Sequence, residues 1–325
     1  MDINSSEKLT TRRWITKTRL MEQKSLIALL ILIAVVSSFS PNFFTLNNLF
    51  NILQQTSVNA IMAVGMTLVI LTSGIDLSVG SLLALTGAVA ASMIGNDVNA
   101  LLAVVGTLTL GATIGACTGF IISKGKVQAF IATLVMMLLL RGVTRVYTDG
   151  SPINTGFNDN ADLLGWFGIG RPLGIPTPVW IMLLVFIVAW FILHHTRLGR
   201  YIYALGGNES ATRLSGINVD KIKIIVYSLC GLLAALASII EVARLSSAQP
   251  MAGSGYELDA IAAVVLGGTS LAGGKGRIIG TLIGALILGF LNNGLNLLNI
   301  SSNYQMIVKA VVILLAVLVD NKSSK

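Results

Sequence analysis

Long runs without charge constrain this chain more than any other feature. No Asp, Glu, Lys or Arg occurs among the fifty-one residues from 25 to 75, and further charge-free windows cover 77–96, 98–123, 172–193 and 278–308. A helix needs about 20 apolar residues to cross the hydrocarbon core of a bilayer, and these windows reach that length. Charged residues make up 11% of the chain, against about 25% in soluble proteins. The pattern predicts an all-α, polytopic membrane protein.

The apolar segments accommodate about ten membrane-spanning helices. Small residues recur within them, as in LGATIGACTGF at 110–120, and small residues allow helices to pack closely in lipid. The predicted spans are 25–40, 57–72, 77–95, 99–122, 127–147, 177–193, 224–244, 258–272, 278–298 and 305–319. We therefore expect one transmembrane domain at 25–319, between short cytoplasmic tails at 1–24 and 320–325.

The basic residues indicate the orientation, because Lys and Arg are retained on the cytoplasmic side of a membrane. With the N-terminus inside, seventeen of the 22 Lys and Arg residues fall in the two tails, the turns after the fourth and eighth spans, and the loop at 194–223. Both termini are therefore predicted to be cytoplasmic. The same distribution explains the net charge of +8 and argues against nucleic-acid binding, because the basic residues are divided among separate loops.

A single acid, Asp76, interrupts the apolar sequence ILTSGIDLSVGS between the second and third predicted spans. Gly74 can adopt a backbone conformation closed to other residues, and Asp76 can accept hydrogen bonds from free amides at the start of the next helix. Helix capping is the simpler interpretation. The alternative is a position on a substrate or proton path, which an acid within a membrane often marks.

The glycine-rich sequence GGTSLAGGKGR at 267–277 does not form a nucleotide-binding loop. That loop requires four residues between its glycine and the Gly-Lys pair, followed by Ser or Thr. Here five residues separate Gly268 from Gly274, and Gly276 follows Lys275. No catalytic pairing or CxxC spacing occurs elsewhere. We expect a subunit that is not an enzyme and carries no cofactor or metal of its own.

The polar side chains expected to enter the membrane are uncharged amides, namely Gln54, Gln55, Asn59, Asn292, Asn293 and Asn296. They can join helices by hydrogen bonds, or they can line a path for neutral hydroxylated solutes, because an amide both donates and accepts. Both interpretations stay open. The candidate translocation-path residues are Asn59, Asp76, Asn292, Asn293 and Asn296.

The loop at 194–223 predicts a short helix outside the membrane. Within ALGGNESATRLSGINV, Asn208 can cap the helix, Glu209 lies in its first turn, and Gly216 is placed to end it. Arg213 follows Glu209 by four residues, the favourable order for an ion pair on a helix. The helix is either a surface connector or a docking element for a cytoplasmic partner.

Several segments together resemble a known family. LTSGIDLSVGS, QAFIATLVMMLLLRG, RLGRYIYALGGN, SGINV and LDAIAAVVLGGTSLAGGKG, with the ten-span layout, are similar to the monosaccharide branch of ABC-importer permeases, and within it to bacterial ribose permeases. Ala204, Gly207 and Ile217 resemble a degenerate form of the motif by which such permeases engage their ATPases. This sequence lacks the glutamate before the alanine and the Leu-Pro that follows in the motif.

The resemblance implies a homodimer in the bacterial inner membrane that imports ribose or a closely related monosaccharide. Its partners would be cytoplasmic ABC ATPase subunits, a periplasmic sugar-binding protein and the lipid bilayer. The implied ATPase-coupling residues are Ala204, Gly207, Asn208, Glu209, Arg213, Gly216 and Ile217. Two alternatives remain, a proton-coupled secondary transporter that uses Asp76 and a passive channel.

Overall fold

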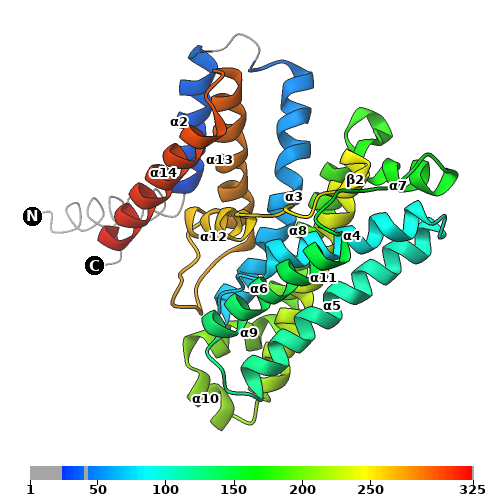
Figure 1. Cartoon of the computed structure of the whole chain (residues 1–325). Coiled ribbons are helices and arrows are strands. Elements are labelled where there is room, and N and C mark those ends of the chain that lie inside the picture. Colours follow the sequence, from blue (N-terminus) through cyan, green and yellow to red (C-terminus); the bar gives the residue numbers. More distant parts are fainter. Residues whose placement is uncertain (1–23, 40–42, 324–325) are drawn as a thin grey trace, which may run out of the picture.

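The computed structural model describes residues 24–39 and 43–323, which form helices and one small β-ribbon (Figure 1). The helices that correspond to predicted spans are α2 (Lys24–Phe39), α3 (Leu46–Leu71), α4 (Val79–Gly95), α5 (Ala100–Ser123), α6 (Ala129–Tyr147), α8 (Thr177–His195), α11 (Val219–Leu245), α12 (Tyr256–Leu266), α13 (Ile278–Leu297) and α14 (Ser302–Ser323). The predicted tail at 1–24 lies outside the described residues except for Lys24. At the other end, α14 continues beyond the predicted limit of 319.

All ten predicted spans overlap helices, but several differ from those helices in length. α3 starts well before the predicted residue 57, because Thr45 caps it by accepting a hydrogen bond from the Asn48 amide at 3.3 Å. The predicted span 258–272 is wrong at its end, since α12 stops at Leu266 and Gly268 turns the chain with φ 84°. Among the described residues, six helices are long and apolar enough to cross a membrane: α3, α5, α6, α8, α11 and α13.

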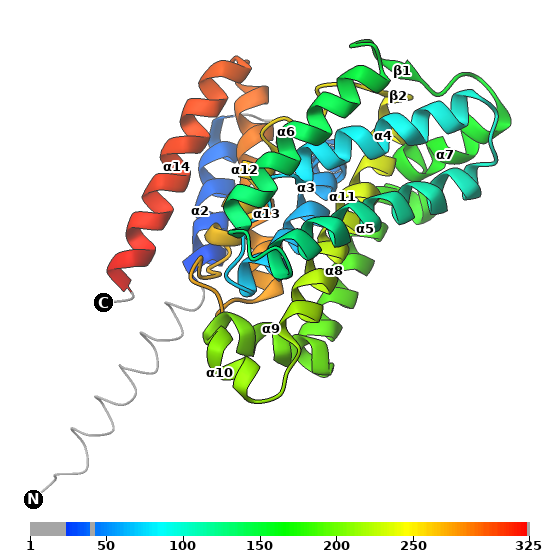
Figure 2. The same cartoon turned by 60° about the horizontal axis from the view of Figure 1, so that its bottom comes forward.

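The core forms around α3 and α11, which are the most deeply buried of the long helices (Figure 2). Glycines explain how closely α5 approaches α11. A Cβ at Gly111 would lie 2.5 Å from the Ala235 Cβ, and a Cβ at Gly115 would overlap the Tyr227 carbonyl oxygen. Small residues therefore supply close packing here, as expected for helices in lipid.

The segment between α6 and α8 contains structure that the hydropathy pattern did not predict. α7 (Asp159–Ile169) begins after Asn158, whose side chain accepts a hydrogen bond from the Ala161 amide. β1 (Ile153–Asn154) pairs antiparallel with β2 (Ser247–Ala248), which places Ile153 opposite Ala248. These elements cover the ends of α4 and α11 on one side of the molecule.

The loops that were predicted to be cytoplasmic meet at one end of the bundle. Lys124 of the α5–α6 turn forms an ion pair with Asp220 of α11 at 3.0 Å. The Tyr203 hydroxyl donates to the Gly276 carbonyl oxygen at 2.9 Å, which joins the loop at 194–223 to the turn at 267–277. Figure 2 shows α9 (Arg197–Gly207) and α10 (Glu209–Leu214) at this end and the β-ribbon at the opposite end. The side of the membrane that each end faces stays a prediction.

Candidate functional site

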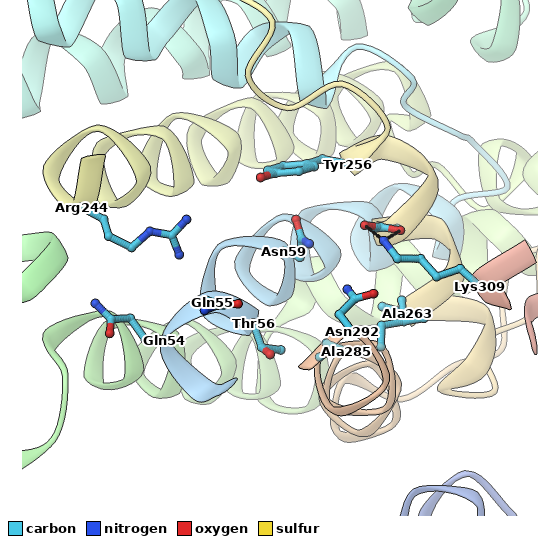
Figure 3. A pocket seen from close by; sticks show the side chains of 13 residues that line it. Gln54, Gln55, Thr56, Asn59, Arg244, Tyr256, Ala263, Ala285, Asn292 and Lys309 are labelled. Atoms are coloured by element: carbon cyan, nitrogen blue, oxygen red, sulfur yellow. Dashed lines mark hydrogen bonds and ion pairs between the residues drawn. The ribbon is translucent and has the colours of Figure 1, made fainter. Parts of the chain in front are cut away.

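A polar cavity of about 320 Å³ lies between five helices, α3, α11, α12, α13 and α14 (Figure 3). α3 and α13 contribute the two amides predicted as path residues, Asn59 and Asn292, so the structure brings these two together. The complete lining is Gln54, Gln55, Thr56, Asn59, Arg244, Tyr256, Asp259, Ala263, Ala285, Leu288, Gly289, Asn292 and Lys309.

Three oxygen atoms of this cavity are buried without a hydrogen-bond partner in the described part of the chain: Thr56 Oγ1, Asn59 Oδ1 and Asn292 Oδ1. Figure 3 shows Asn59 and Asn292 directed toward the space below the Tyr256 ring, with Thr56 on the neighbouring turn of α3 directed toward α13. An unsatisfied buried acceptor costs about 1–3 kcal/mol. A neutral molecule with several hydroxyl groups would satisfy all three oxygens, and hydroxyl oxygens could accept from the amide nitrogens in return.

The charged side chains of the cavity are largely neutralised. Lys309 Nζ lies 3.1 Å from a carboxylate oxygen of Asp259, and both side chains are mostly buried. Arg244 is the remaining charged residue of the lining. Gln54 uses its amide nitrogen to bind the Gly168 carbonyl oxygen at 2.7 Å, so it also anchors α7. Apart from Arg244, the cavity therefore presents uncharged polar groups and one neutralised ion pair.

The other two predicted path amides do not line this cavity. Asn293 exchanges two hydrogen bonds with Asn48, at 3.0 and 2.9 Å, and joins α13 to the start of α3. Asn296 Oδ1 accepts from the Gln305 side chain at 2.7 Å and joins α13 to α14. Their observed contacts are those of residues that hold helices together.

Asp76 lies in the turn between α3 and α4 and is only 1% exposed. One carboxylate oxygen accepts from the Ser78 amide at 2.9 Å and from the Ser78 hydroxyl at 2.6 Å, directly before α4 begins. These bonds stabilise the turn before α4, but the N-cap residue is Ser78 and its side chain makes no capping hydrogen bond, so a capping role of Asp76 stays a prediction. Asp76 does not line the polar cavity, and its role on a translocation path stays a prediction.

The prediction of an unusual backbone at Gly74 is wrong. Ser73 has the left-handed conformation, with φ 62°. Gly74 is required for space instead, because a Cβ there would lie 2.5 Å from the Tyr227 hydroxyl oxygen. The sequence located the turn correctly, but it could not show that a tyrosine of α11 packs against it.

The predicted loop helix is α10, and its local chemistry is confirmed. Asn208 Oδ1 accepts from the Ala211 amide at 2.9 Å, and Gly216 ends the turn with φ 79°. The Arg213–Glu209 pair is present at 3.3 Å. The preceding helix α9 was not predicted; Ala204 and Gly207 belong to it, and Ile217 follows α10.

Ion pairs fix α10 to the membrane helices. Lys223 Nζ binds Glu209 at 2.8 Å, and Arg213 binds Asp220 at 3.2 Å. Burial acts to raise the pKa of Glu209, but hydrogen bonds and charge from Lys223 and Arg213 outweigh it and hold the pKa below its ordinary value. α10 is therefore attached to the start of α11 through charged contacts.

A junction of three segments, which the sequence did not indicate, lies beside α9. The Gly274 amide donates to the Leu71 carbonyl oxygen at 3.0 Å. A Cβ at Gly206 would overlap both atoms of that hydrogen bond. The Ser73 hydroxyl donates to the Ala272 carbonyl oxygen at 2.8 Å. We call the contacts of Gly206, Leu71, Ser73 and residues 272–274 the glycine junction. The adjacent pairs Gly206–Gly207 and Gly273–Gly274 are the signal that could have located it.

A helical membrane protein with a polar cavity between its helices and a charged helical loop at one end belongs to the class of solute permeases. Comparison with known proteins agrees: residues 48–317 match the family described as branched-chain amino acid transport system / permease component. The chain belongs to this permease family.

Relatives match over nearly the full length. The chain is 83% identical to the ribose import permease of Escherichia coli strain K12, covering 98% of this chain and 99% of that protein. It is 67% identical to the ribose import permease of Haemophilus influenzae, covering 93% and 94%, and 55% identical to that of Bacillus subtilis strain 168, covering 92% of each. The relatives are named as transport permeases. No solved structure matches the chain.

Proposed function

We propose that the chain is the membrane-spanning permease subunit of an ATP-driven ABC importer that carries ribose into a bacterial cell. The observation that carries this function is 83% identity over 318 residues to a ribose import permease. The apolar helices and this relationship place the protein in the bacterial inner membrane. Its ATP chemistry belongs to a separate cytoplasmic ATPase, and a periplasmic sugar-binding protein delivers the sugar.

Finer features of the assembly are part of the same proposal. The permease acts as a homodimer, each copy crosses the membrane ten times, and both termini are cytoplasmic. The six long apolar helices, the three shorter ones and α12 supply the ten segments. The meeting of the predicted inner loops at one end supports this topology, because cytoplasmic loops hold the excess of Lys and Arg.

The sugar passes through the polar cavity, where Asn59, Asn292 and Thr56 exchange hydrogen bonds with its hydroxyl groups. ATP binding closes the ATPase pair, α10 moves with it, and the path changes the side to which it opens. The near-neutral lining supports this assignment, because ribose carries hydroxyl groups and no charge.

Uptake into vesicles tests the proposed function. We expect ribose accumulation that requires ATP, the ATPase subunit and loaded binding protein, and that survives Asp76→Asn because the asparagine oxygen can accept the same hydrogen bonds from Ser78. Uptake by this chain alone, driven by a pH gradient and abolished by Asp76→Asn, would instead establish a proton-coupled transporter. A panel of pentoses and hexoses in the same assay identifies the sugar.

Two neighbouring amides provide a matched test of the path. Asn292→Leu should lower ribose uptake roughly threefold to tenfold, the equivalent of one hydrogen bond, without lowering stability, because the Asn292 Oδ1 has no partner. Asn293→Leu removes both bonds to Asn48 and should lower stability by about 1–2 kcal/mol. Its uptake per folded molecule should stay unchanged. Thermal unfolding in detergent and uptake are measured for both variants. Normal uptake by Asn292→Leu together with lost uptake per folded molecule in Asn293→Leu would exclude the cavity as the path.

A further inference from the structure

A second cavity, of about 700 Å³, lies beside α10. Its walls are the turn after α3, the turn between α5 and α6, α10, and the beginning of α11. None of the steps proposed for sugar import uses it. We call it the lower cavity.

The charges of the lower cavity leave one lysine uncompensated. Glu209 is paired with Lys223 at 2.8 Å, and Asp220 is paired with Lys124 at 3.0 Å. Arg213 contacts both acids, at 3.3 and 3.2 Å. Lys126 also lines the cavity and forms no ion pair within the part of the chain that the structure describes. The lining therefore attracts an anion.

Backbone donors reinforce that attraction. α6 is 19 residues long and begins directly after Gln128, whose side chain makes no capping hydrogen bond. Gln128 and Ala129 both line the cavity. The first amides of a helix are free donors at the positive end of its dipole and form a favourable site for phosphate oxygens.

A buried hydroxyl group provides an independent indication of a ligand. Tyr227 is 1% exposed and lines the lower cavity, and its hydroxyl oxygen has no hydrogen-bond partner among the described residues. The oxygen lies at the wall formed by Gly74. The Asp76 carboxylate forms no hydrogen bond with this hydroxyl group; its Oδ1 accepts from Ser78. A ligand oxygen in the cavity would give the Tyr227 hydroxyl an acceptor.

The surroundings of Lys126 indicate the source of the anion. Phe120 and Ile121 at the end of α5 are exposed, as are Phe130 and Ile131 at the start of α6. These apolar side chains flank the Lys126 turn in sequence and suit contact with acyl chains. A phosphate beside them belongs at the boundary between headgroups and hydrocarbon, where lysine attracts anionic lipid.

We propose that the lower cavity binds the phosphate of an anionic phospholipid headgroup, with Lys126, the first amides of α6 and the Tyr227 hydroxyl as donors. The lipid occupies the space between α10 and the membrane helices. It therefore stabilises the position of the loop that carries the charged contacts of Glu209 and Arg213.

Binding of phosphatidylglycerol to the purified full-length protein in neutral detergent tests this proposal, with phosphatidylcholine as the neutral lipid. Wild-type protein should bind phosphatidylglycerol and gain thermal stability from it. Lys126→Gln and Tyr227→Phe should each weaken that binding roughly tenfold, since each removes a donor to a charged group. Lys221→Gln is the matched control, because Lys221 is exposed nearby on α11 but does not line the cavity.

The unfolding temperature measured without lipid shows whether the Tyr227 hydroxyl group binds a ligand or only stabilises the fold. Tyr227→Phe should unfold at the wild-type temperature in its absence, because the hydroxyl has no partner to lose. Unchanged phosphatidylglycerol affinity in both variants would overturn the proposal. The proposal would also fail if inorganic phosphate stabilised the protein equally and no lipid bound. It would fail too if Lys126→Gln lost ATPase association but still bound lipid normally, because the cavity would then belong to the ATPase interface.

Discussion

Gly206→Ala is expected to destabilise the protein by about 2–4 kcal/mol and to abolish most transport. The new Cβ would overlap the Leu71 carbonyl oxygen and the Gly274 amide nitrogen, which are hydrogen-bonded to each other at 3.0 Å. Overpacking against the backbone costs about 1–3 kcal/mol, and loss of the hydrogen bond adds about 1 kcal/mol. Backbone atoms of two segments would have to separate to accommodate one methyl group.

Gly207→Ala is the matched control on the same helix. No atom lies within 4 Å of a Cβ built at Gly207, and alanine favours helix over glycine by as much as about 1 kcal/mol. Thermal unfolding of the two variants in detergent should therefore differ strongly, with Gly207→Ala at or above the wild-type temperature. Equal stability of Gly206→Ala and wild type would contradict the observed packing of the glycine junction.

Arg213→Glu is expected to uncouple ATP hydrolysis from the permease. The change removes the contacts of Arg213 with Glu209 and Asp220 and places a third acid beside them. Exposed ion pairs contribute about 0.2–1 kcal/mol each, so the membrane helices should remain folded. The displaced α10 should lower ATP turnover stimulated by the loaded binding protein roughly tenfold or more, which corresponds to about 1.4 kcal/mol of lost interaction.

Lys221→Glu provides the control for charge reversal on the same face of the molecule, since Lys221 is exposed and takes no part in the ion pairs of α10. Co-purification of the ATPase with each detergent-solubilised variant, together with ATP turnover, separates lost binding from lost stimulation. Wild-type binding and wild-type stimulation in Arg213→Glu would mean that α10 is only a connector.

Local chemistry was predictable from the sequence, whereas the roles of individual amides were not. The cap at Asn208 and the contact of Asp76 with the start of α4 depend on residues a few positions apart, so short patterns define them. Asn292 and Asn293 are adjacent in sequence, but a helix rotates by about 100° per residue. One therefore lines the cavity and the other binds Asn48. Only the three-dimensional arrangement of the neighbouring helices separates these two roles.

The errors in helix boundaries have related causes. Hydropathy continues past Leu266, so the pattern extended α12 into the glycine turn, where Gly268 and Gly273 require left-handed backbone. α7 was missed because its first turn carries Asp159 and Asp162, which resembles a polar loop. The glycine junction was missed because close approach between distant segments leaves no local pattern beyond the glycines themselves.

The continuity of α3 has a mechanical consequence. Leu71, at the glycine junction, and Asn59, in the polar cavity, belong to one uninterrupted helix, and twelve residues of helix span about 18 Å. No proline lies between them, and Gly65 packs closely against α11, where a Cβ built at Gly65 would lie 3.0 Å from the Cys230 Cα, so the helix has no free hinge there. A tilt imposed at the Leu71 end must therefore displace Asn59 as part of the same rigid rod. If the proposed function is correct, the movement that the ATPase imposes at one end and the width of the proposed sugar path both depend on one quantity, the angle of α3.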